Sequence, residues 1–162
     1  MTPPAMLDNI LAQPASHRAV LALHQGGARA NLRVCAGKIR NAQGRVIVTG
    51  MGGSLFAAVP AVSHLHQQGY LAQAVESAEL LHYGSAHLRA ADLGIVISRS
   101  GESIEPVLLA EKMRHAGMTI IAVTNVTGSK LEQLAHLTLA IGAQAPVDMR
   151  RERRQGCCTS FT

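Results

Sequence analysis

The fold is decided by a stretch that places a branched apolar run before a glycine-rich turn, Val46-Ile47-Val48-Thr49-Gly50-Met51-Gly52-Gly53-Ser54-Leu55. A helical pattern of apolar residues then runs over residues 54–68. Consecutive apolar residues, as opposed to apolar residues alternating with polar ones, are typical of a strand that is buried on both faces. The stretch therefore predicts a strand, a tight turn and a helix, which is the repeating unit of a parallel sheet.

The same unit recurs along the rest of the chain. Short apolar runs predict further strands over residues 71–75, 95–97, 120–123 and 137–141. Helical patterns follow over residues 78–83, 103–116 and 129–135. We therefore predict an α/β fold, with a five-stranded, doubly wound parallel sheet of the flavodoxin-like kind flanked by helices.

The chain before the first strand is predicted to be helical. Apolar residues recur with helical spacing from Pro14 to Arg40, interrupted at Gly26-Gly27, where two helices are expected to meet. A short amphipathic piece ahead of them ends at Gln13-Pro14. We divide the chain into a helical N-terminal extension (1–44), a ligand-binding core (45–142) and a basic, irregular C-terminal tail (143–162).

Composition limits the class of protein. The 162 residues are 48% hydrophobic, and no apolar run approaches the ~18 residues that span a bilayer, so we expect a soluble, cytoplasmic protein without a membrane partner. The first ten residues do not resemble a signal peptide. Cys35 stands alone, and Cys157-Cys158 has the spacing of neither a disulfide framework nor a metal knuckle. We predict no metal, no cofactor and no structural disulfide.

The net charge of +5 depends on a cluster of four arginines near the C-terminus, Arg150, Arg151, Arg153 and Arg154. Without this cluster the chain is close to neutral. Aromatic residues make up only 2% of the sequence, so the stacking surfaces of single-strand binders are missing. The sequence argues against nucleic acid as a partner and favours a basic tail that is solvated or faces an interface.

The first glycine-rich turn, with Gly50, Gly52 and Gly53, ends at the start of a predicted helix. Glycines allow left-handed backbone and bring a ligand close to the main chain, and a helix N-terminus offers unpaired N–H groups to an anion. Ser54 adds a hydroxyl donor. The turn lacks the lysine of a Walker A loop and the spacing of a dinucleotide fingerprint. Taken alone, it fits a tight structural turn as well as a binding loop.

The second turn, Ser98-Arg99-Ser100-Gly101-Glu102-Ser103, is more informative. Several hydroxyls beside a helix N-terminus supply neutral donors to one anion, which favours a phosphate group. Ser103 has an alternative role as the helix N-cap, with Pro106 tolerated in the first turn. If Ser103 caps the helix, Ser98 and Ser100 still remain for a ligand.

Three other features have structural interpretations beside functional ones. Ser129 is expected to be an N-cap. Glu79, or Glu76, could act as a general base that moves a proton between adjacent sugar carbons, or could only favour a helix dipole. His64 and His66, two residues apart on a predicted helix, face different directions, so we interpret them as structural.

With these turns placed, the chain resembles a SIS domain, the sugar-isomerase module of phosphosugar isomerases, phosphosugar-binding regulators and glutamine:fructose-6-phosphate aminotransferase. The likeness runs from Asn9 to about Gly142 and is strongest to the first isomerase half of the aminotransferase. Its motifs are the opening Asp8 to Pro14, Gly52-Gly53-Ser54, Ser98 to Ser103 and Asn125-Val126-Thr127-Gly128-Ser129.

The resemblance implies that sugar phosphate contacts come from residues of both turns: Gly52, Gly53, Ser54, Ser98, Arg99, Ser100, Gly101 and Ser103. Arg99 and Gly53 replace the glutamine and threonine of the aminotransferase, which adds a charge and removes a hydroxyl. The acid and base residues of that enzyme lie in a second SIS half and tail, and the Ala-Ser-Thr-Lys stretch ending its first half is not matched. The chain thus resembles one SIS lobe whose catalytic set is incomplete, and Glu79 is the only base that we nominate.

Two hypotheses follow. The chain is a catalytic subunit for isomerisation, amino transfer or deamination of a hexose 6-phosphate such as fructose 6-phosphate or glucosamine 6-phosphate. Alternatively, it is a non-catalytic phosphosugar sensor or an incomplete lobe of a two-lobe isomerase. A homodimer or higher homo-oligomer is expected in either case, because the helical front is more apolar than the rim of a single domain requires.

Overall fold

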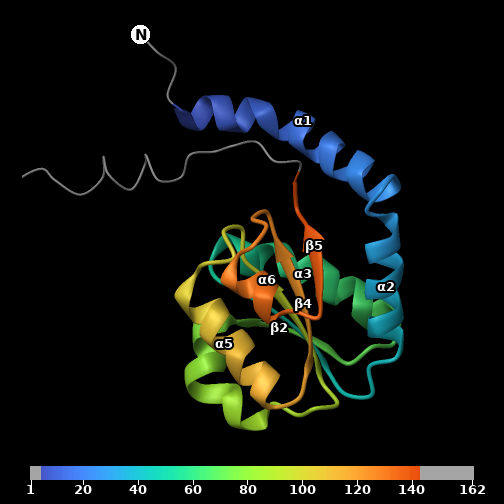
Figure 1. The fold of residues 1–162 in the computed structure, drawn as a ribbon, viewed down its shortest axis with the longest axis vertical. Helices are drawn as coiled ribbons and strands as arrows, with labels where there is room; N and C mark the ends of the chain where they lie inside the picture. The colour runs from blue at the N-terminus through green and yellow to red at the C-terminus, as the bar shows by residue number, and fades with distance from the viewer. Residues whose placement is uncertain (1–4, 143–162) are drawn as a thin grey trace, which may run out of the picture.

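The computed structural model describes residues 5–142, except for the side chains of residues 5, 6 and 9. It contains a five-stranded sheet between two layers of helices (Figure 1). The strands are β1 (Val46–Gly50), β2 (Ala72–Glu76), β3 (Leu93–Ile97), β4 (Thr119–Thr124) and β5 (Leu137–Ala140). All pairs are parallel and the order is β2-β1-β3-β4-β5. The predicted class and the five predicted strands are confirmed.

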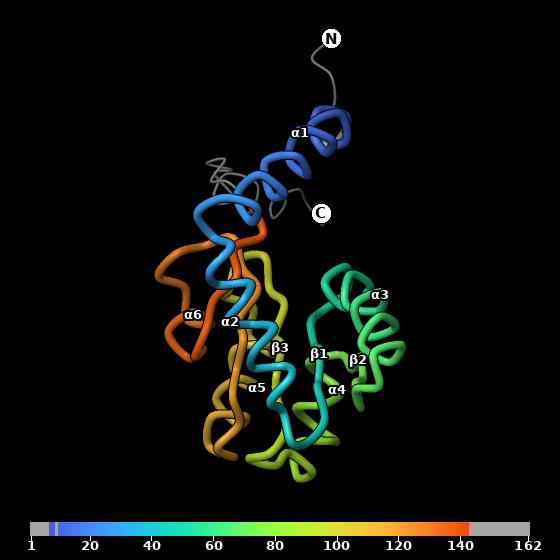
Figure 2. The backbone as a smooth tube through the Cα atoms, turned by 90° about the vertical axis from the view of Figure 1, so that its right-hand side faces the viewer, coloured from blue at the N-terminus to red at the C-terminus, as the bar shows by residue number. Residues whose placement is uncertain are grey.

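Helices connect the strands on alternate faces of the sheet. They are α1 (Ala5–Gln25), α2 (Arg29–Arg40), α3 (Gly53–Gln67), α4 (Ser77–Glu79), the π-helical turn η1 (Leu80–Gly84), the 3₁₀ turn η2 (Ser85–His87), α5 (Ile104–His115) and α6 (Lys130–Leu134). Side chains of α2 and α3 pack on one face, and those of η1, α5 and α6 pack on the other. Figure 2 shows α5 and α6 on the opposite side of the strands from α3.

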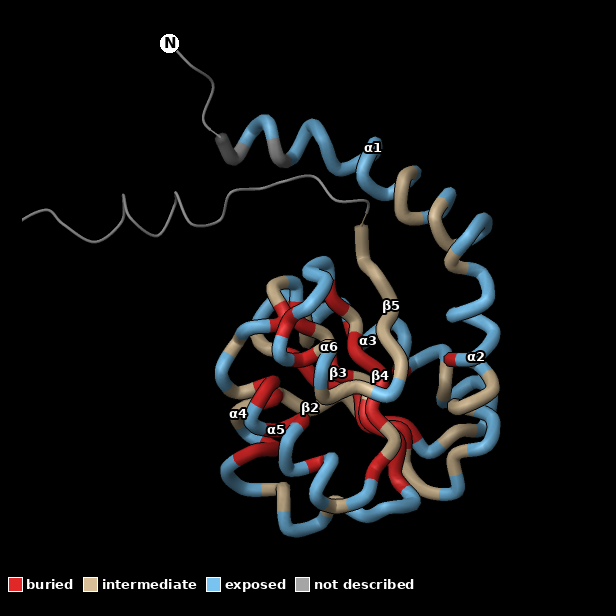
Figure 3. Tube along the Cα trace, viewed as in Figure 1, coloured by how far each residue is buried: buried red, intermediate tan, exposed pale blue. Residues whose placement is uncertain are grey.

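Side chains of β1 point alternately to the two faces of the sheet, and each face is covered by its own layer of helices. Val46 and Val48 pack with Ala58 of α3 on one face, whereas Ile47 packs with Leu109 of α5 on the other. All five residues of β1 are buried, as expected for a central strand covered on both faces. Figure 3 shows the buried residues gathered in the strands at the centre of the molecule. This burial holds β1 in place and so fixes the position of the turn that follows Gly50.

The helical front departs from the prediction at one place. A break at Gly26-Gly27 is confirmed, because α1 ends at Gln25 and α2 begins at Arg29. The predicted end at Gln13-Pro14 is wrong, since Pro14 lies inside α1. Proline cannot donate a hydrogen bond to the carbonyl four residues earlier. The residues around Pro14 are exposed, so water can solvate that carbonyl and the helix continues.

α1 leans away from the rest of the molecule (Figure 1) and carries exposed apolar side chains, with Leu11 70% exposed and Leu21 59% exposed. None of the helices within residues 5–142 is both long and apolar enough to cross a bilayer. The Arg150–Arg154 cluster and the Cys157-Cys158 pair lie outside the described residues.

The amino edge of the sheet is held by an ion pair between Arg45 and Asp92. The Asp92 carboxylate accepts hydrogen bonds from Nη2 of Arg45 at 2.6 Å, from the backbone N–H of Arg45 at 2.8 Å and from the N–H of Arg89 at 3.2 Å. Burial alone would raise the pKa of Asp92. The hydrogen bonds and charge of Arg45, with the amide of Arg89, outweigh burial, so the pKa lies below its ordinary value.

Candidate functional site

The two glycine- and serine-rich turns leave the sheet side by side at its carboxyl edge. Gly50, the last residue of β1, is in register with Ile97, the last residue of β3. On its other side Gly50 is in register with Glu76, the last residue of β2. The strand order reverses between β1 and β3, and in doubly wound sheets ligands bind outside the carboxyl ends at such a point. The expected position of both turns is therefore confirmed.

The first turn is shaped by a close approach at Gly50. A Cβ on Gly50 would lie 2.8 Å from Cβ of Ser54 and 3.0 Å from the carbonyl oxygen of Ile97, which leaves no room for a side chain. Gly52 takes a left-handed backbone, with φ of 49°, at the N-cap position of α3, where no side chain caps the helix. Half-buried Ser54 is thus held close to the end of β3, beside an uncapped helix N-terminus.

The second turn is held in shape by its own hydroxyls. The backbone N–H of Gly101 donates to Oγ of Ser98 at 3.2 Å, and the N–H of Glu102 donates to Oγ of Ser100 at 3.2 Å. Ser98 is only 3% exposed, and its hydroxyl donates to Oγ of Ser103 at 3.3 Å. Ser98 and Ser103 are therefore linked directly, and Ser100 binds an amide of the same turn between β3 and α5.

Ser103 occupies the N-cap position of α5, but its side chain makes no capping hydrogen bond. An N-cap hydroxyl normally accepts from the N–H of the second or third helical residue. The third residue here is Pro106, which has no N–H. α5 therefore begins without a side-chain cap, and the N–H groups of Ile104 and Glu105 have no acceptor within the helix.

A third turn braces the second. The carbonyl oxygen of Arg99 accepts from the N–H of Asn125 at 3.1 Å, and that of Gly101 accepts from the N–H of Leu131 at 3.1 Å. Ser129 caps α6, because its hydroxyl accepts from the N–H of Glu132 at 3.4 Å. The predicted N-cap role of Ser129 is confirmed. The turn that Ser129 helps to form is the one that braces the second turn.

Gly101 is the point of closest contact between these two turns. Its φ is 64°, and a Cβ placed on it would lie 2.2 Å from Oγ of Ser129 and 3.0 Å from Oγ1 of Thr124. Only glycine fits both the backbone conformation and the space. The sequence analysis did not identify Thr124 as a contact of the second turn, although Thr124 directly follows an apolar strand run.

A buried hydroxyl pair lies between the ends of β1 and β2. Oγ1 of Thr49 and Oγ of Ser77 are 3.0 Å apart, and both residues are fully buried. The pair joins the strand before the first turn to the first residue of α4. Sequence reasoning missed it, although Thr49 is a polar residue directly after an apolar strand run, whereas Ser77 is separated from its run by Glu76.

A family model for the SIS domain matches residues 38–161, more than half of the chain. The chain belongs to the SIS domain family. The helices and strands of this SIS domain also match solved structures. The three described next are each less than 25% identical to this chain, so these likenesses show the fold.

Three solved structures illustrate the range. An Escherichia coli CFT073 protein in complex with A5P is 19% identical, with a TM-score of 0.73, over 89% of this chain and 77% of that chain. The sugar isomerase domain of the RpiR transcription factor from Sphaerobacter thermophilus is 22% identical, with a TM-score of 0.73, over 90% and 79%. Tagatose-6-phosphate ketose/aldose isomerase from Escherichia coli is 22% identical, with a TM-score of 0.71, over 88% and 41%.

The nominated base of this SIS domain, Glu79, is exposed at the end of α4. Glu76 is half-buried, precedes α4 and ends β2 in register with Gly50. α4 is only three residues long and continues into η1. Its helix dipole is therefore too small to stabilise either carboxylate appreciably. The role of Glu79 as a base stays a prediction.

The histidines of α3 do not form a shared site. A ring nitrogen of His66 is hydrogen-bonded to the carbonyl oxygen of Ala72 at the start of β2, and His64 is exposed. Across residues 5–142 no group of three His, Cys, Asp or Glu side chains is placed to hold a metal ion.

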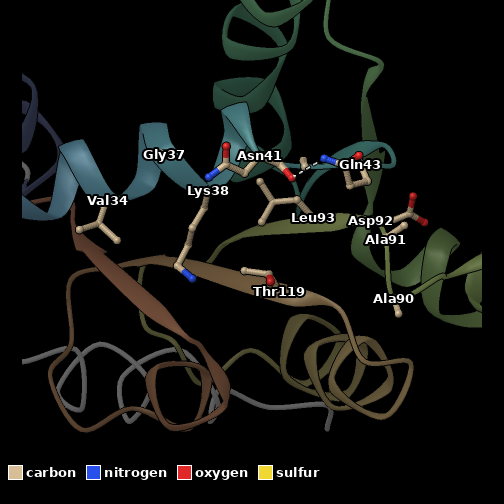
Figure 4. A pocket seen from close by; sticks show the side chains of 11 residues that line it. Val34, Gly37, Lys38, Asn41, Gln43, Ala90, Ala91, Asp92, Leu93 and Thr119 are labelled. Atoms are coloured by element: carbon tan, nitrogen blue, oxygen red, sulfur yellow. Dashed lines mark hydrogen bonds between the residues drawn. The ribbon is translucent and has the colours of Figure 1, made fainter.

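Three cavities of the SIS domain lie away from the two turns. One of about 540 Å³ is at the amino edge of the sheet, between α2 and the first residues of β3 and β4. Figure 4 shows Lys38 extending from α2 toward Thr119 in this cavity, with Asp92 at its far end.

Proposed function

We propose that the chain binds a sugar phosphate at the carboxyl edge of β1 and β3, with the phosphate between the two turns. One contrast carries the proposal. Of the helices of five residues or more that directly follow a strand, α3 and α5 have no side-chain cap, whereas α6, which begins at the bracing turn, is capped by Ser129. Uncapped helix N-termini beside hydroxyls favour an anion. Membership of the SIS family and the A5P complex of a protein with the same fold support this choice of ligand.

The residues proposed to form the site are those of both turns: Gly52, Gly53, Ser54, Ser98, Arg99, Ser100, Gly101 and Ser103. Backbone amides and serine hydroxyls would hold the phosphate. Arg99 is exposed, and its guanidinium adds a positive charge beside the turn, which favours a dianion. We propose residues 45–142 as the binding core, after a helical extension over residues 1–44.

Binding is tested by thermal unfolding with fructose 6-phosphate and with free fructose at equal concentration. A ligand that binds only the native state raises its stability by RT ln(1 + [L]/Kd). We expect the phosphate ester to raise the unfolding temperature and free fructose to leave it unchanged. Equal effects of the two sugars, or no effect of any hexose phosphate, would contradict the proposal.

The reaction proposed is isomerisation, or amino transfer or deamination, of a hexose 6-phosphate, with Glu79 as the base. A coupled isomerase assay tests it with Glu79→Gln, and Glu111→Gln on the exposed face of α5 is the matched control. Loss of turnover in the first variant alone supports catalysis. Turnover that survives Glu79→Gln removes Glu79 from the mechanism. The closeness to the aminotransferase half and a cytoplasmic location stay predictions from the sequence.

A non-catalytic sensor is the second candidate. It is favoured because Glu79 is exposed, and because a transcription factor contains a domain of the same fold. Binding of fructose 6-phosphate without turnover in the same assay supports this candidate.

We also propose a homodimer formed through the helical front. Leu7, Ile10, Leu11 and Leu21 are 45%, 47%, 70% and 59% exposed, and their spacing places them on one side of α1. Light scattering on the full chain is expected to give twice the monomer mass, and Leu11→Glu with Leu21→Glu is expected to give the monomer. A monomeric wild-type chain would rule out this partner.

A further inference from the structure

A cavity of about 460 Å³ lies at the elbow between α1 and α2, and we call it the elbow cavity. It is lined by His24, Gln25, Arg29, Leu32, Arg33 and Ala36. None of these residues belongs to the two turns. The hydrogen bond from His24 to the carbonyl oxygen of Ala140, with Nε2 and O 2.8 Å apart, places the elbow beside the end of β5. In the sheet, β5 is separated from β3 by β4.

The two arginines of the elbow cavity lie at positions where their positive charges destabilise α2 in the protein without a ligand. Arg29 and Arg33 are one helical turn apart, where two like charges destabilise a helix. Arg29 also begins α2, at the end where the helix dipole disfavours a cation, and the first turn contains no acidic residue. Residues 9–75 contain no Asp or Glu at all, so neutralisation by a neighbour in sequence is absent.

Neither arginine is neutralised by a residue distant in sequence. Among residues 5–142 the ion pairs join Arg45 to Asp92 and Lys130 to Glu102, and both Arg29 and Arg33 are exposed. Within the same part of the chain, Nδ1 of His24 is the buried side-chain nitrogen or oxygen that lacks a hydrogen-bond partner. Two guanidinium groups thus line one cavity without an acidic partner. Because Nε2 of His24 donates to the carbonyl oxygen of Ala140, a neutral His24 ring presents Nδ1 as an acceptor that lacks a donor.

We infer that the elbow cavity is a second anion site, which binds a small phosphate-bearing molecule and is independent of the proposed sugar phosphate site. Each guanidinium group can offer two parallel N–H donors to the oxygens of a phosphate, and Arg29 and Arg33 both line this cavity. A bound dianion would offset the like-charge repulsion and the unfavourable dipole together. The concave shape favours a compact anion over an extended polymer.

The test is isothermal titration of the full chain with inorganic phosphate and with pyrophosphate, at constant ionic strength in sodium chloride. Four proteins are compared: wild type, Arg29→Gln/Arg33→Gln, Ser100→Ala/Ser103→Ala and the control Arg18→Gln, an exposed arginine of α1 outside the cavity. We expect the serine variant and the control to keep the elbow site. We expect the double arginine variant to weaken it at least about tenfold.

This design separates the two proposals. If the turns do not bind phosphate, wild type shows one site, and the double arginine variant removes it. If the elbow does not bind phosphate, the double arginine variant gives the wild-type isotherm, and the inference is overturned. Heat from a DNA duplex without heat from phosphate or pyrophosphate would also overturn it.

A second readout does not depend on the variants. The ring resonances of His24 in the wild-type chain should shift when phosphate or pyrophosphate is added, because the imidazole lines the cavity. The same shift should appear in Ser100→Ala/Ser103→Ala and be absent in Arg29→Gln/Arg33→Gln. Ring resonances that stay fixed at saturating pyrophosphate would overturn the inference whatever the folding of the variants.

Discussion

Ser103 stands at the N-cap of α5, and Pro106, three residues later, lacks the amide that such a hydroxyl would bind. The hydroxyl of Ser103 accepts from Ser98 and not from the helix, so the first turn of α5 keeps unpaired N–H groups beside this hydroxyl. Loss of a working N-cap costs a helix about 1 kcal/mol. At α5 the structure has the residue of a cap without its hydrogen bond, at the place where we propose a phosphate.

The first prediction compares two N-cap serines. Ser129→Ala should destabilise the fold by about 1 kcal/mol or more, because Ser129 caps α6 through the N–H of Glu132. Ser103→Ala should cost less, because no capping bond is lost, but should weaken binding of fructose 6-phosphate. Urea unfolding and ligand titration of both variants provide the measurement. A larger stability loss for Ser103→Ala would show that its hydroxyl is structural.

The second prediction concerns the contact between the second turn and its brace. Gly101→Ala should destabilise the fold by about 2–4 kcal/mol, from left-handed strain of ~1–2 kcal/mol and a clash with Ser129. Gly128→Ala is the control, since its φ is 77° and nothing lies within 4 Å of its added Cβ. It should show the strain alone. Equal losses in urea unfolding would mean that the contact with Ser129 is unimportant.

The third prediction concerns the buried hydroxyl pair. Thr49→Val leaves Ser77 without its partner and should cost about 1–3 kcal/mol. Ser77→Ala alone should cost a similar amount. The double variant should be less destabilised than the sum of the two, because neither hydroxyl is then left unpaired. A double-mutant cycle by urea unfolding measures the coupling, and strict additivity would show that the two hydroxyls do not interact.

The fourth prediction is a dependence of stability on pH. The pKa of Asp92 is lower in the folded than in the unfolded chain. The carboxylate therefore stabilises the fold above its unfolded pKa, near the ordinary value of 3.8, and this contribution is lost as pH falls through the lower folded pKa. Asp92→Asn should be less stable at pH 7 and should lose less stability between pH ~5 and ~2 than wild type. Parallel stability curves would contradict the pKa shift.

The sequence predicted the parts of this fold that depend on neighbours in the chain. The run Val46-Ile47-Val48 is apolar on both faces, and its burial on both faces follows from that pattern alone. The turns after β1 and β3 were predicted for the same reason, since glycine and serine follow each run directly. Parallel strand ends share an edge, so the meeting of the two turns followed as well.

Contacts between distant segments were not predictable in this way. Nothing local to Gly101 shows that Ser129 lies against it, and nothing local to Thr49 identifies Ser77 as its partner. The helix through Pro14 also escaped prediction, because propensity disfavours it and only the exposure of the surrounding residues permits it. The missing cap at Ser103 is different, since Pro106 in the sequence already removes the N–H of the third helical residue.

The turn after β3 is braced by a neighbouring turn and the turn after β1 is not, so the two turns differ in how easily their backbones can move. Backbone hydrogen bonds join the segment after β3 to the segment after β4, whereas those of the segment after β1 are local, from Ser54 to Met51 and from Leu55 to Gly52. An added Cβ on Gly52 or Gly53 would meet nothing within 4 Å. We therefore expect the serine-rich segment after β3 to stay fixed and the glycine-rich segment after β1 to move when a ligand binds.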